Sequence, residues 1–230
     1  MSAGPDARSP IASRHSDSAA CPLCGARAVR PYHRADQREY VACARCRLVF
    51  VPPRYWPTRD EERARYDQHR NAPADAGYRA FLSRPFRAVL DRVPPPAAGL
   101  DFGSGSGPTL STMLEEAGYA VSLFDVYYAP ERAVLDRSYD FITCTEVIEH
   151  LHEPTRELRR LVERLVPGGW LIVQTQLLPA KDLFTTTWRY RRDPTHVAFY
   201  SVEAFRWLAD LLGCRMERPS TDVFALRRSH

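Results

Sequence analysis

A glycine-rich turn between an apolar run and an amphipathic stretch limits the folds open to this chain. It reads Leu100-Asp101-Phe102-Gly103-Ser104-Gly105-Ser106-Gly107-Pro108. Pro108 suits the first position of a helix, where an N–H would have no intrahelical partner. Glycines let a ligand come close to the backbone, and a helix N-terminus offers it free N–H groups. The segment therefore predicts a strand, a ligand-binding turn and a helix. The proline at 108 sets it apart from the dinucleotide-binding pattern G-x-G-x-x-G.

After this turn the chain alternates between short apolar runs and amphipathic stretches. The apolar runs predict strands at 100–102, 119–124, 139–143, 170–175, 215–217 and 223–226. Helices are expected to begin at Pro108, Pro154 and Ser201. This alternation predicts an α/β fold with a doubly wound, mostly parallel sheet that helices cover on both faces.

Two Cys-x-x-Cys pairs precede this region. Cys21 and Cys24 form the first pair, Cys43 and Cys46 form the second, and eighteen residues separate the pairs. Two such turns can direct four sulfurs at one ion, which is the spacing of a zinc ribbon. Two disulfides or four free thiols are the alternatives, and the lack of a secretory signal disfavours the disulfides. Four thiolates leave no open coordination position, so the predicted zinc is structural.

Composition and chain-breaking residues divide the sequence into four parts. Thr58 and Glu61 form a capping-box pattern that opens a charged helix. The run from Pro94 to Gly99 is the clearest linker. The predicted parts are a flexible tail at 1–20, a zinc-ribbon module at 21–56, a helical connector or cover at 57–98 and the main domain at 99–230.

Five segments of the main domain, in their order and spacing, resemble the class I S-adenosylmethionine-dependent methyltransferases. They are Leu-Asp-Phe-Gly-Ser-Gly-Ser-Gly at 100–107, the acid Asp125, Tyr-Asp-Phe-Ile at 139–142, Glu-Val-Ile-Glu-His-Leu at 146–151 and Leu-Val-Pro-Gly-Gly-Trp-Leu at 165–171. The resemblance covers roughly residues 99–230. It implies a Rossmann-like, seven-stranded sheet whose last strand is antiparallel. It also implies that S-adenosylmethionine binds across the carboxyl edge of the strands.

The resemblance assigns the cofactor contacts. Asp125 ends a strand 22 residues after Gly103, which suits a carboxylate that accepts hydrogen bonds from ribose hydroxyls. Asp101, beside the glycines, would repel a pyrophosphate but not a ligand with an ammonium group. The expected cofactor-binding residues are Asp101, Gly103, Ser104, Gly105, Gly107, Asp125, Val126, Thr145 and Glu146.

One interval departs from the family pattern. Only fourteen residues lie between Asp125 and Asp140, where the family usually fits a helix, a strand and another helix. The usual acid on the adenine side therefore has no counterpart. Tyr127 and Tyr128 are expected to build the adenine pocket instead.

Methyl transfer needs a positioned nucleophile and often a base, and histidine is the natural base near neutral pH. His150 follows the strand that would face the cofactor, and His196 lies in an aromatic-flanked loop before the last helix. Both are predicted catalytic residues, with packing under the cofactor as the alternative for His150. Glu146, Glu149 and His150 are also candidates for a divalent ion, as the same motif suggests for some quinone-pathway O-methyltransferases. Residues 185–190 are expected either to close over the substrate or to pack as a simple loop.

The charge of +4 is unevenly divided, with +7 in residues 1–98 and −3 in residues 99–230. The arginines are scattered rather than striped, which indicates a solvated surface more than a nucleic-acid patch. No apolar run approaches the roughly 20 residues that cross a bilayer, and the first residues lack an apolar signal region. We therefore expect a cytoplasmic protein without a membrane partner.

Three classes of function fit these observations. The first is a methyltransferase that acts on a C or O atom of a small, sugar- or quinone-like molecule. The zinc-ribbon layout resembles deoxysugar C-methyltransferases, and the segment 146–150 resembles quinone-pathway enzymes. The alternative is an RNA guanine methyltransferase that uses the zinc module for RNA, although the Asn/Asp-Pro-Pro-aromatic motif of exocyclic-amine methylation is absent. The third, least expected, is a non-catalytic protein that only binds S-adenosylmethionine.

Overall fold

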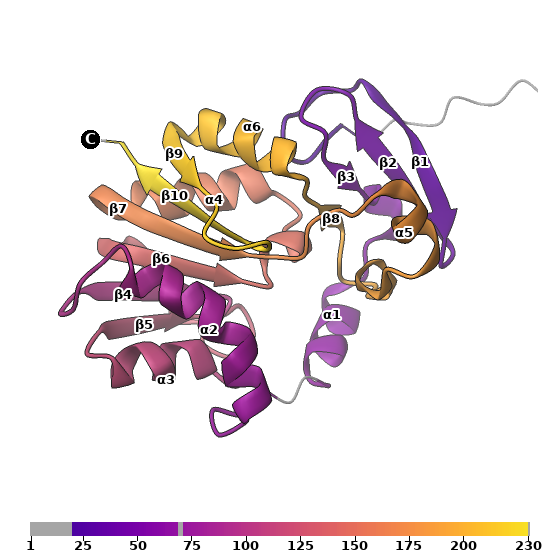
Figure 1. The fold of residues 1–230 in the computed structure, drawn as a ribbon. Coiled ribbons are helices and arrows are strands. Elements are labelled where there is room, and N and C mark those ends of the chain that lie inside the picture. Colours follow the sequence, from indigo (N-terminus) through magenta and orange to yellow (C-terminus); the bar gives the residue numbers. More distant parts are fainter. Residues whose placement is uncertain (1–19, 69–70, 230) are drawn as a thin grey trace, which may run out of the picture.

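The structure, a computed structural model, describes residues 20–68 and 71–229. The tail predicted at 1–20 lies, except for Ala20, outside these ranges. In the described ranges the chain builds two sheets, a large one and a smaller N-terminal one beside it (Figure 1). None of the helices there is long and apolar enough to cross a bilayer.

The large sheet carries the fold that the alternation predicts. Its strands stand in the order β5 (Ala120–Phe124), β4 (Ala98–Phe102), β6 (Tyr139–Thr145), β7 (Leu165–Gln174), β10 (Val223–Arg228) and β9 (Cys214–Glu217). The four strands from β5 to β7 pair in parallel, whereas β10 pairs antiparallel with both β7 and β9. The mostly parallel sheet and its antiparallel last strand are therefore confirmed.

The expected number of seven strands is wrong for the described residues, because this sheet has six. After β5 the chain makes a short bridge between Asp125 and Ala129 and then a 3₁₀ turn at Arg132–Asp136 before it enters β6. A strand with its flanking helices needs more residues than this interval holds. β5 is consequently the edge of the sheet.

Helices cover both faces of the large sheet because its strands are apolar on both sides. α2 (Ala76–Leu90) and α3 (Thr109–Glu116) pack on one face, and α4 (Pro154–Glu163) and α6 (Val202–Leu212) pack on the other (Figure 1). Consecutive strand residues alternate between the two layers: Phe141 joins the α2–α3 side, and Ile142 joins the α4–α6 side. The expected helix starts near Pro108, at Pro154 and after Ser201 are confirmed.

The N-terminal sheet is not built from N-terminal residues alone. Its order is β1 (Val29–Ala35), β2 (Arg38–Cys43), β3 (Val49–Phe50) and β8 (Ala198–Phe199), all antiparallel. The short helix α5 (Lys181–Thr186) adds Phe184 to the apolar cluster on this sheet. A strand from the predicted main domain thus completes the predicted zinc-ribbon module. The boundaries between the four predicted parts stay predictions.

The connector begins with α1 (Arg59–Tyr66), whose capping box is present as predicted. Thr58 Oγ1 accepts from Glu61 N, and the Glu61 carboxylate accepts from Thr58 N at 2.7 Å. None of the α1 side chains is fully buried. In Figure 1 this helix stands at the end of the large sheet where β4, β5 and β6 terminate, so it lies over the carboxyl ends of the parallel strands.

Candidate active site

A cavity of about 440 Å³ lies where the carboxyl ends of β4, β5 and β6 meet. Parallel strands bring their following loops together at such an edge, which is where α/β folds bind ligands. The walls come from the glycine turn, the loops after β5 and β6, helices α1 and α2, and the loop at 193–196. The predicted site residues that line it are Gly103, Ser104, Gly105, Asp125, Val126, Thr145, Glu146, His150 and His196.

The glycine turn needs glycine for two different steric reasons. Gly103 has a φ of +78°, and a Cβ there would lie 2.3 Å from Val147 Cγ2. A Cβ at Gly107 would lie 1.5 Å from the carbonyl oxygen of Asn71, so this glycine admits the chain that leads into α2. Gly107 therefore faces Asn71 in the segment that leads into α2, whereas Gly103 and Gly105 line the cavity.

Asp125 follows β5, and its carboxylate is held by three backbone N–H groups. Its Oδ2 accepts a hydrogen bond from Gly105 N at 3.0 Å, and its Oδ1 accepts from Tyr127 N at 2.8 Å and Tyr128 N at 3.1 Å. The carboxylate is thus fixed by backbone donors while it lines the cavity. Val126 follows and is 53% exposed, and Tyr127 and Tyr128 line the cavity beside it. This arrangement offers an acid for hydroxyl groups next to apolar and aromatic surface.

Asp101 has a different place from the other predicted cofactor residues. It lies beneath the glycine turn, 4% exposed, and does not line the cavity. Its carboxylate accepts from Ser111 Oγ at 2.7 Å and from Thr143 Oγ1 at 2.8 Å. Burial raises the pKa of Asp101. Its hydrogen bonds tie β4 to β6 and α3, so it acts on the cavity through the position of the turn.

The glycine turn, the end of β6 and the residue after it supply polar atoms that have no partner in the described part of the protein. Glu146 has a φ of +53° and donates its N–H to Gln174 O. Thr145 Oγ1, Glu146 Oε1 and Ser104 Oγ are buried and lack a hydrogen-bond partner there. Burial, and then the nearby Glu149 carboxylate, raise the pKa of Glu146 to about 9. Unsatisfied buried polar atoms of this kind fit a polar or cationic ligand.

The two predicted histidines lie together although 46 positions separate them in the sequence. Their ring centroids are 4.6 Å apart with the rings nearly perpendicular. His150 Nδ1 lies 3.1 Å from Thr195 O, and His196 Nδ1 lies 2.7 Å from Tyr190 O. A carbonyl oxygen can only accept, so both Nδ1 atoms carry hydrogen, and the Nε2 atoms of the neutral rings hold lone pairs. Burial lowers the pKa of each histidine to about 4, which keeps both rings neutral at pH 7.

A buried acid stands behind this histidine pair. Glu149 is fully buried, and its Oε1 lies 3.8 Å from His150 Nε2. Thr175 Oγ1 donates to its Oε2 at 2.9 Å, and the Tyr190 hydroxyl donates to Oε1. Among the described residues, Glu149, His150 and His196 offer ligand atoms within 4.8 Å of one another, whereas Glu146 is not in this group. Tyr190 belongs to the stretch 185–190, which was expected either to close over the substrate or to pack as a loop. No feature of the sequence predicted the hydrogen bond between the Tyr190 hydroxyl and Glu149.

The cover of the cavity comes from α1 and α2 and was not predicted residue by residue. Tyr66 meets His150 edge-on with centroids 5.3 Å apart, and the Tyr127 hydroxyl donates to Glu62 at 3.1 Å. Tyr78 and Phe81 line the cavity from α2. The aromatic stripe of α2 was the available signal, but its period alone does not tell a cavity wall from core packing.

Asp193 also lines the cavity, close in sequence to His196. It accepts from Arg65 Nε at 2.8 Å and from Thr195 N and Oγ1 at 3.0 and 2.6 Å. Although burial acts in the opposite direction, these hydrogen bonds hold the pKa of Asp193 well below its usual range. The carboxylate therefore stays charged and joins α1 to the loop that carries His196.

The four predicted metal ligands gather into a second, separate cluster. The sulfurs of Cys21, Cys24, Cys43 and Cys46 all lie within 4.8 Å of one another. Cys21 and Cys46 Sγ are 3.5 Å apart, and Cys24 and Cys43 Sγ are 3.4 Å apart. These distances exceed the roughly 2.05 Å of a disulfide and approach the edge of a tetrahedron with bonds of about 2.3 Å. Four sulfurs in this arrangement suit a tetrahedral metal ion.

The chain is similar to known proteins in its sequence. A family model described as a methyltransferase domain matches residues 74–218. The ubiquinone biosynthesis O-methyltransferase of Nitrosospira multiformis is 30% identical over 77 residues, which are 34% of this chain and 32% of that protein. The chain thus spans about a third of the length of this curated relative.

Solved structures are similar to this chain at low sequence identity. A possible exported protein from Bordetella parapertussis superposes with a TM-score of 0.50 and 17% identity, over 76% of this chain and 81% of that one. CalO1, a methyltransferase of calicheamicin biosynthesis, gives a TM-score of 0.49 and 15% identity over 68% of this chain and 59% of its own. At these identities the similarity concerns the fold alone.

Proposed function

The chain belongs to the methyltransferase domain family, and we propose that it transfers a methyl group from S-adenosylmethionine to an O or C atom of a small molecule. The observation that carries this proposal is the cavity itself. It combines the glycine turn, the Asp125 carboxylate, the unpartnered atoms at 145–146 and a pair of neutral histidines at one sheet edge. Each part matches a different need of this reaction.

The residues present fit the cofactor. Asp125 faces the cavity as an acceptor for the ribose hydroxyls, and Val126 with Tyr127 offers surface for the adenine. The turn at 103–105 lies where the methionine part would sit. The unpartnered Glu146 Oε1 and Thr145 Oγ1 offer acceptors to an ammonium group. When bound, S-adenosylmethionine supplies an electrophilic methyl group on a sulfonium sulfur.

The histidines supply the base. In each neutral ring Nδ1–H is held by a carbonyl oxygen, so the Nε2 lone pair is free to take a proton from an acceptor hydroxyl. The positive charge that develops on His150 lies 3.8 Å from the Glu149 carboxylate, which stabilises it. Aromatic side chains of α1 and α2, Tyr66, Tyr78 and Phe81, also line the cavity and would shield bound ligands from water. Lys and Arg are absent from the described residues that line it, so the lining suits a cation and an uncharged acceptor better than a phosphate backbone.

The four-cysteine cluster is proposed to hold one structural Zn²⁺. Tetrahedral S₄ coordination satisfies the ion with protein ligands only, so the cluster would have no part in the methyl transfer. We also propose that the chain is organised as a zinc-ribbon module at 21–56, a helical connector or cover at 57–98 and a main domain at 99–230. The main domain contributes β8 to the N-terminal sheet.

Transfer of tritiated methyl groups tests the proposal. Purified protein is incubated with tritiated S-adenosylmethionine and either a small-metabolite extract or total RNA, with Asp125→Ala as the matched control. The proposal predicts label in the small-metabolite fraction that the control lacks. Label in RNA would favour the RNA guanine methyltransferase instead. Cofactor binding without transfer to any acceptor tested would favour the non-catalytic alternative.

A further inference from the structure

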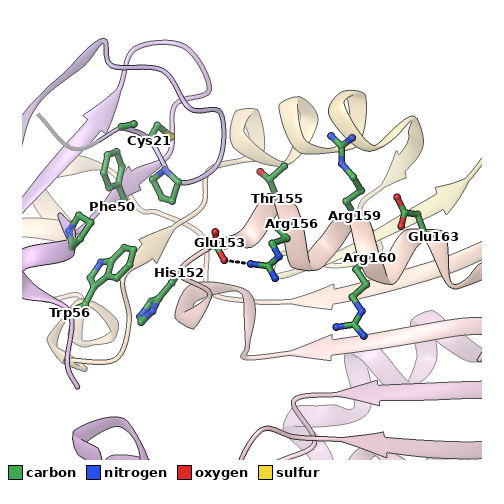
Figure 2. Close-up of a pocket in the computed structure, with 13 residues that line it drawn as sticks. Cys21, Phe50, Trp56, His152, Glu153, Thr155, Arg156, Arg159, Arg160 and Glu163 are labelled. Atoms are coloured by element: carbon green, nitrogen blue, oxygen red, sulfur yellow. Dashed lines mark hydrogen bonds and ion pairs between the residues drawn. The ribbon is translucent and has the colours of Figure 1, made fainter. Parts of the chain in front are cut away.

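The N-terminal sheet meets the rest of the chain in two places. Just before α4, Phe50 and Trp56 stand beside His152 (Figure 2), and the Trp56 indole stacks on the His152 ring with centroids 4.0 Å apart. At the second place, the segment from α5 to β8 runs along the N-terminal sheet (Figure 1). This segment includes residues 190–196, which we call the His196 loop. Because Asp193 and His196 line the cavity, the second contact reaches the active site.

A buried guanidinium makes this second contact. Arg38 is the first residue of β2 and is only 5% exposed. Its Nη1 donates to Pro194 O at 3.0 Å and to His196 O at 3.3 Å. Its Nη2 donates to Asp193 O at 2.8 Å and also to Arg191 O. Four carbonyl oxygens of the His196 loop thus converge on a single cation from the N-terminal sheet.

The β1–β2 hairpin directs the Arg38 side chain. Asp36 and Gln37 form its two-residue turn with φ of +51° and +60°, so β2 begins its pairing with Arg38. Arg38 and Tyr40 are two positions apart and point to the same face of the strand. The Tyr40 hydroxyl accepts from Arg38 Nε at 3.2 Å and donates to Arg191 O at 3.1 Å. The guanidinium is therefore held at Nε as well as at both Nη atoms.

The Arg38 guanidinium is surrounded by dipoles and not by counter-charges. In residues 20–68 and 71–229, no carboxylate lies within 4.0 Å of it. Burial of a cation without compensation is costly, so the four carbonyl oxygens supply that compensation. Without the cation, these converging oxygens would repel one another. The conformation of the His196 loop and the burial of Arg38 therefore depend on each other.

Two further carbonyls of the His196 loop face the histidine pair. Tyr190 O accepts from His196 Nδ1 at 2.7 Å, and Thr195 O accepts from His150 Nδ1 at 3.1 Å. Peptide groups are planar and linked, so the carbonyls that Arg38 holds also fix the directions of the neighbouring ones. The hydrogen bond at one ring nitrogen decides which nitrogen of a neutral histidine carries the proton. The backbone thus connects Arg38 to both histidine rings.

We propose that Arg38 is a positioning residue, which holds the His196 loop so that both His150 and His196 keep the Nδ1–H tautomer. The inference rests on the proposed function, because free Nε2 lone pairs matter to turnover only if the histidines act as bases. Arg38 does not line the cavity, so it acts through the loop and not on the substrate or the cofactor. The N-terminal sheet thereby takes part in the active site independently of any metal that it holds.

Long-range ¹H–¹⁵N correlation spectroscopy on the full chain, labelled with ¹⁵N-histidine, reads the tautomers directly. His150→Asn and His196→Asn assign the two rings, and the wild type should show Nδ1–H in both. Arg38→Met keeps the side-chain length but has no donor. There the tautomer ratio should move towards Nε2–H by about fivefold or more, the effect of losing a neutral hydrogen bond. Arg38→Lys should move it less, because an ammonium group keeps the charge but lacks the planar fork.

The matched control is Arg34→Met, which removes an exposed arginine from the other strand of the same hairpin. This variant should keep the wild-type tautomers. Circular dichroism checks that each variant folds, and if Arg38→Met does not, Arg38→Lys decides the result. Wild-type tautomers in the folded Arg38 variant, or an equal change in Arg34→Met, would overturn the proposal.

Steady-state rates separate this inference from the proposed function. With the acceptor identified by tritium transfer, Arg38→Met should lower kcat by about 10²-fold, as expected for a misplaced catalytic group. Its affinity for S-adenosylhomocysteine should stay at the wild-type value. An unchanged kcat in a variant whose tautomers have changed would overturn the part of Arg38 in the transfer. If the wild type methylates no acceptor, the proposed function fails, and the NMR comparison alone decides whether Arg38 sets the tautomers.

Discussion

The four-cysteine cluster and the active-site cavity both gather groups suited to a ligand, but they are built in opposite ways. The cluster is closed: four sulfurs face one point, and three of the four cysteines are buried. The cavity is open and leaves buried polar atoms of Ser104, Thr145 and Glu146 without partners in the described part of the chain. A complete set of four sulfur ligands suits an ion that stays bound, whereas a cavity with unpartnered polar atoms suits ligands that enter and leave. The difference separates a structural role from a catalytic one.

Removal of the cysteine ligands should have the largest effect on stability. Cys43→Ser/Cys46→Ser leaves two thiolates, which cannot hold zinc tetrahedrally, and structural zinc contributes on the order of 10 kcal/mol to small modules. We expect about one zinc per chain in the wild type, none in the variant, and loss of the N-terminal sheet by circular dichroism and limited proteolysis. A folded wild type without metal would contradict the structural role of zinc in the four-cysteine cluster.

Removal of a histidine should affect turnover and leave the fold intact. His150→Ala and His196→Ala are each expected to lower kcat by 10²- to 10⁴-fold, the range for a general base, while S-adenosylhomocysteine still binds. His33→Ala, outside the cavity, is the comparison variant. Steady-state rates with the identified acceptor make the measurement. Unchanged kcat in both variants would leave the histidine pair with a packing role only.

The histidines also predict a pH dependence of stability. Their folded pKa of about 4 lies below the unfolded value near 6.5, so the unfolded chain binds more protons between these pH values. Stability should therefore fall as pH drops from 6.5 to 4, on the order of 3 kcal/mol for each histidine. Urea unfolding across this range should show a shallower decline in His196→Asn than in the wild type. Parallel pH profiles would mean that His196 is not neutral when folded.

The smallest expected effect is the release of protons on cofactor binding. The pKa of Glu146 is raised to about 9, so the free protein holds a proton there at pH 7.5. An ammonium group beside the carboxylate favours its charged form and lowers the pKa. Up to one proton should leave, seen as a dependence of the binding enthalpy on the ionisation enthalpy of the buffer. Glu146→Gln should abolish this dependence. If the binding enthalpy of the variant still depends on the buffer, the released proton comes from a group other than Glu146.

Much of the site was predictable because it depends on local chemistry and on strand order. A strand–turn–helix unit positions 103–105, and parallel strands must bring Asp125 and the loop after β6 to the same edge. The four cysteines follow from their spacing alone. In each case the residues that interact lie in short motifs whose conformation the sequence determines.

The remainder depends on packing that no short motif encodes. Asp101 was expected at the cofactor, but its side chain accepts hydrogen bonds from Ser111 and Thr143. The short strand is buried on both faces, so its sequence does not show to which face Asp101 points. The pairing of β8 with β3, and of Tyr190 with Glu149, joins segments distant in sequence. The seventh strand was implied by the family pattern, and only the short interval after Asp125 indicated its absence.

Titration of S-adenosylhomocysteine into the wild type and into Asp125→Ala by calorimetry tests the open-cavity account most directly. The wild type should bind one molecule per chain. Because hydrogen bonds to a charged group contribute about 1.5–3 kcal/mol each, loss of the carboxylate should weaken binding by at least 100-fold while the four-cysteine cluster keeps its zinc. Equal affinity in the two proteins, or no binding by the wild type, would contradict the assignment of this cavity to the cofactor.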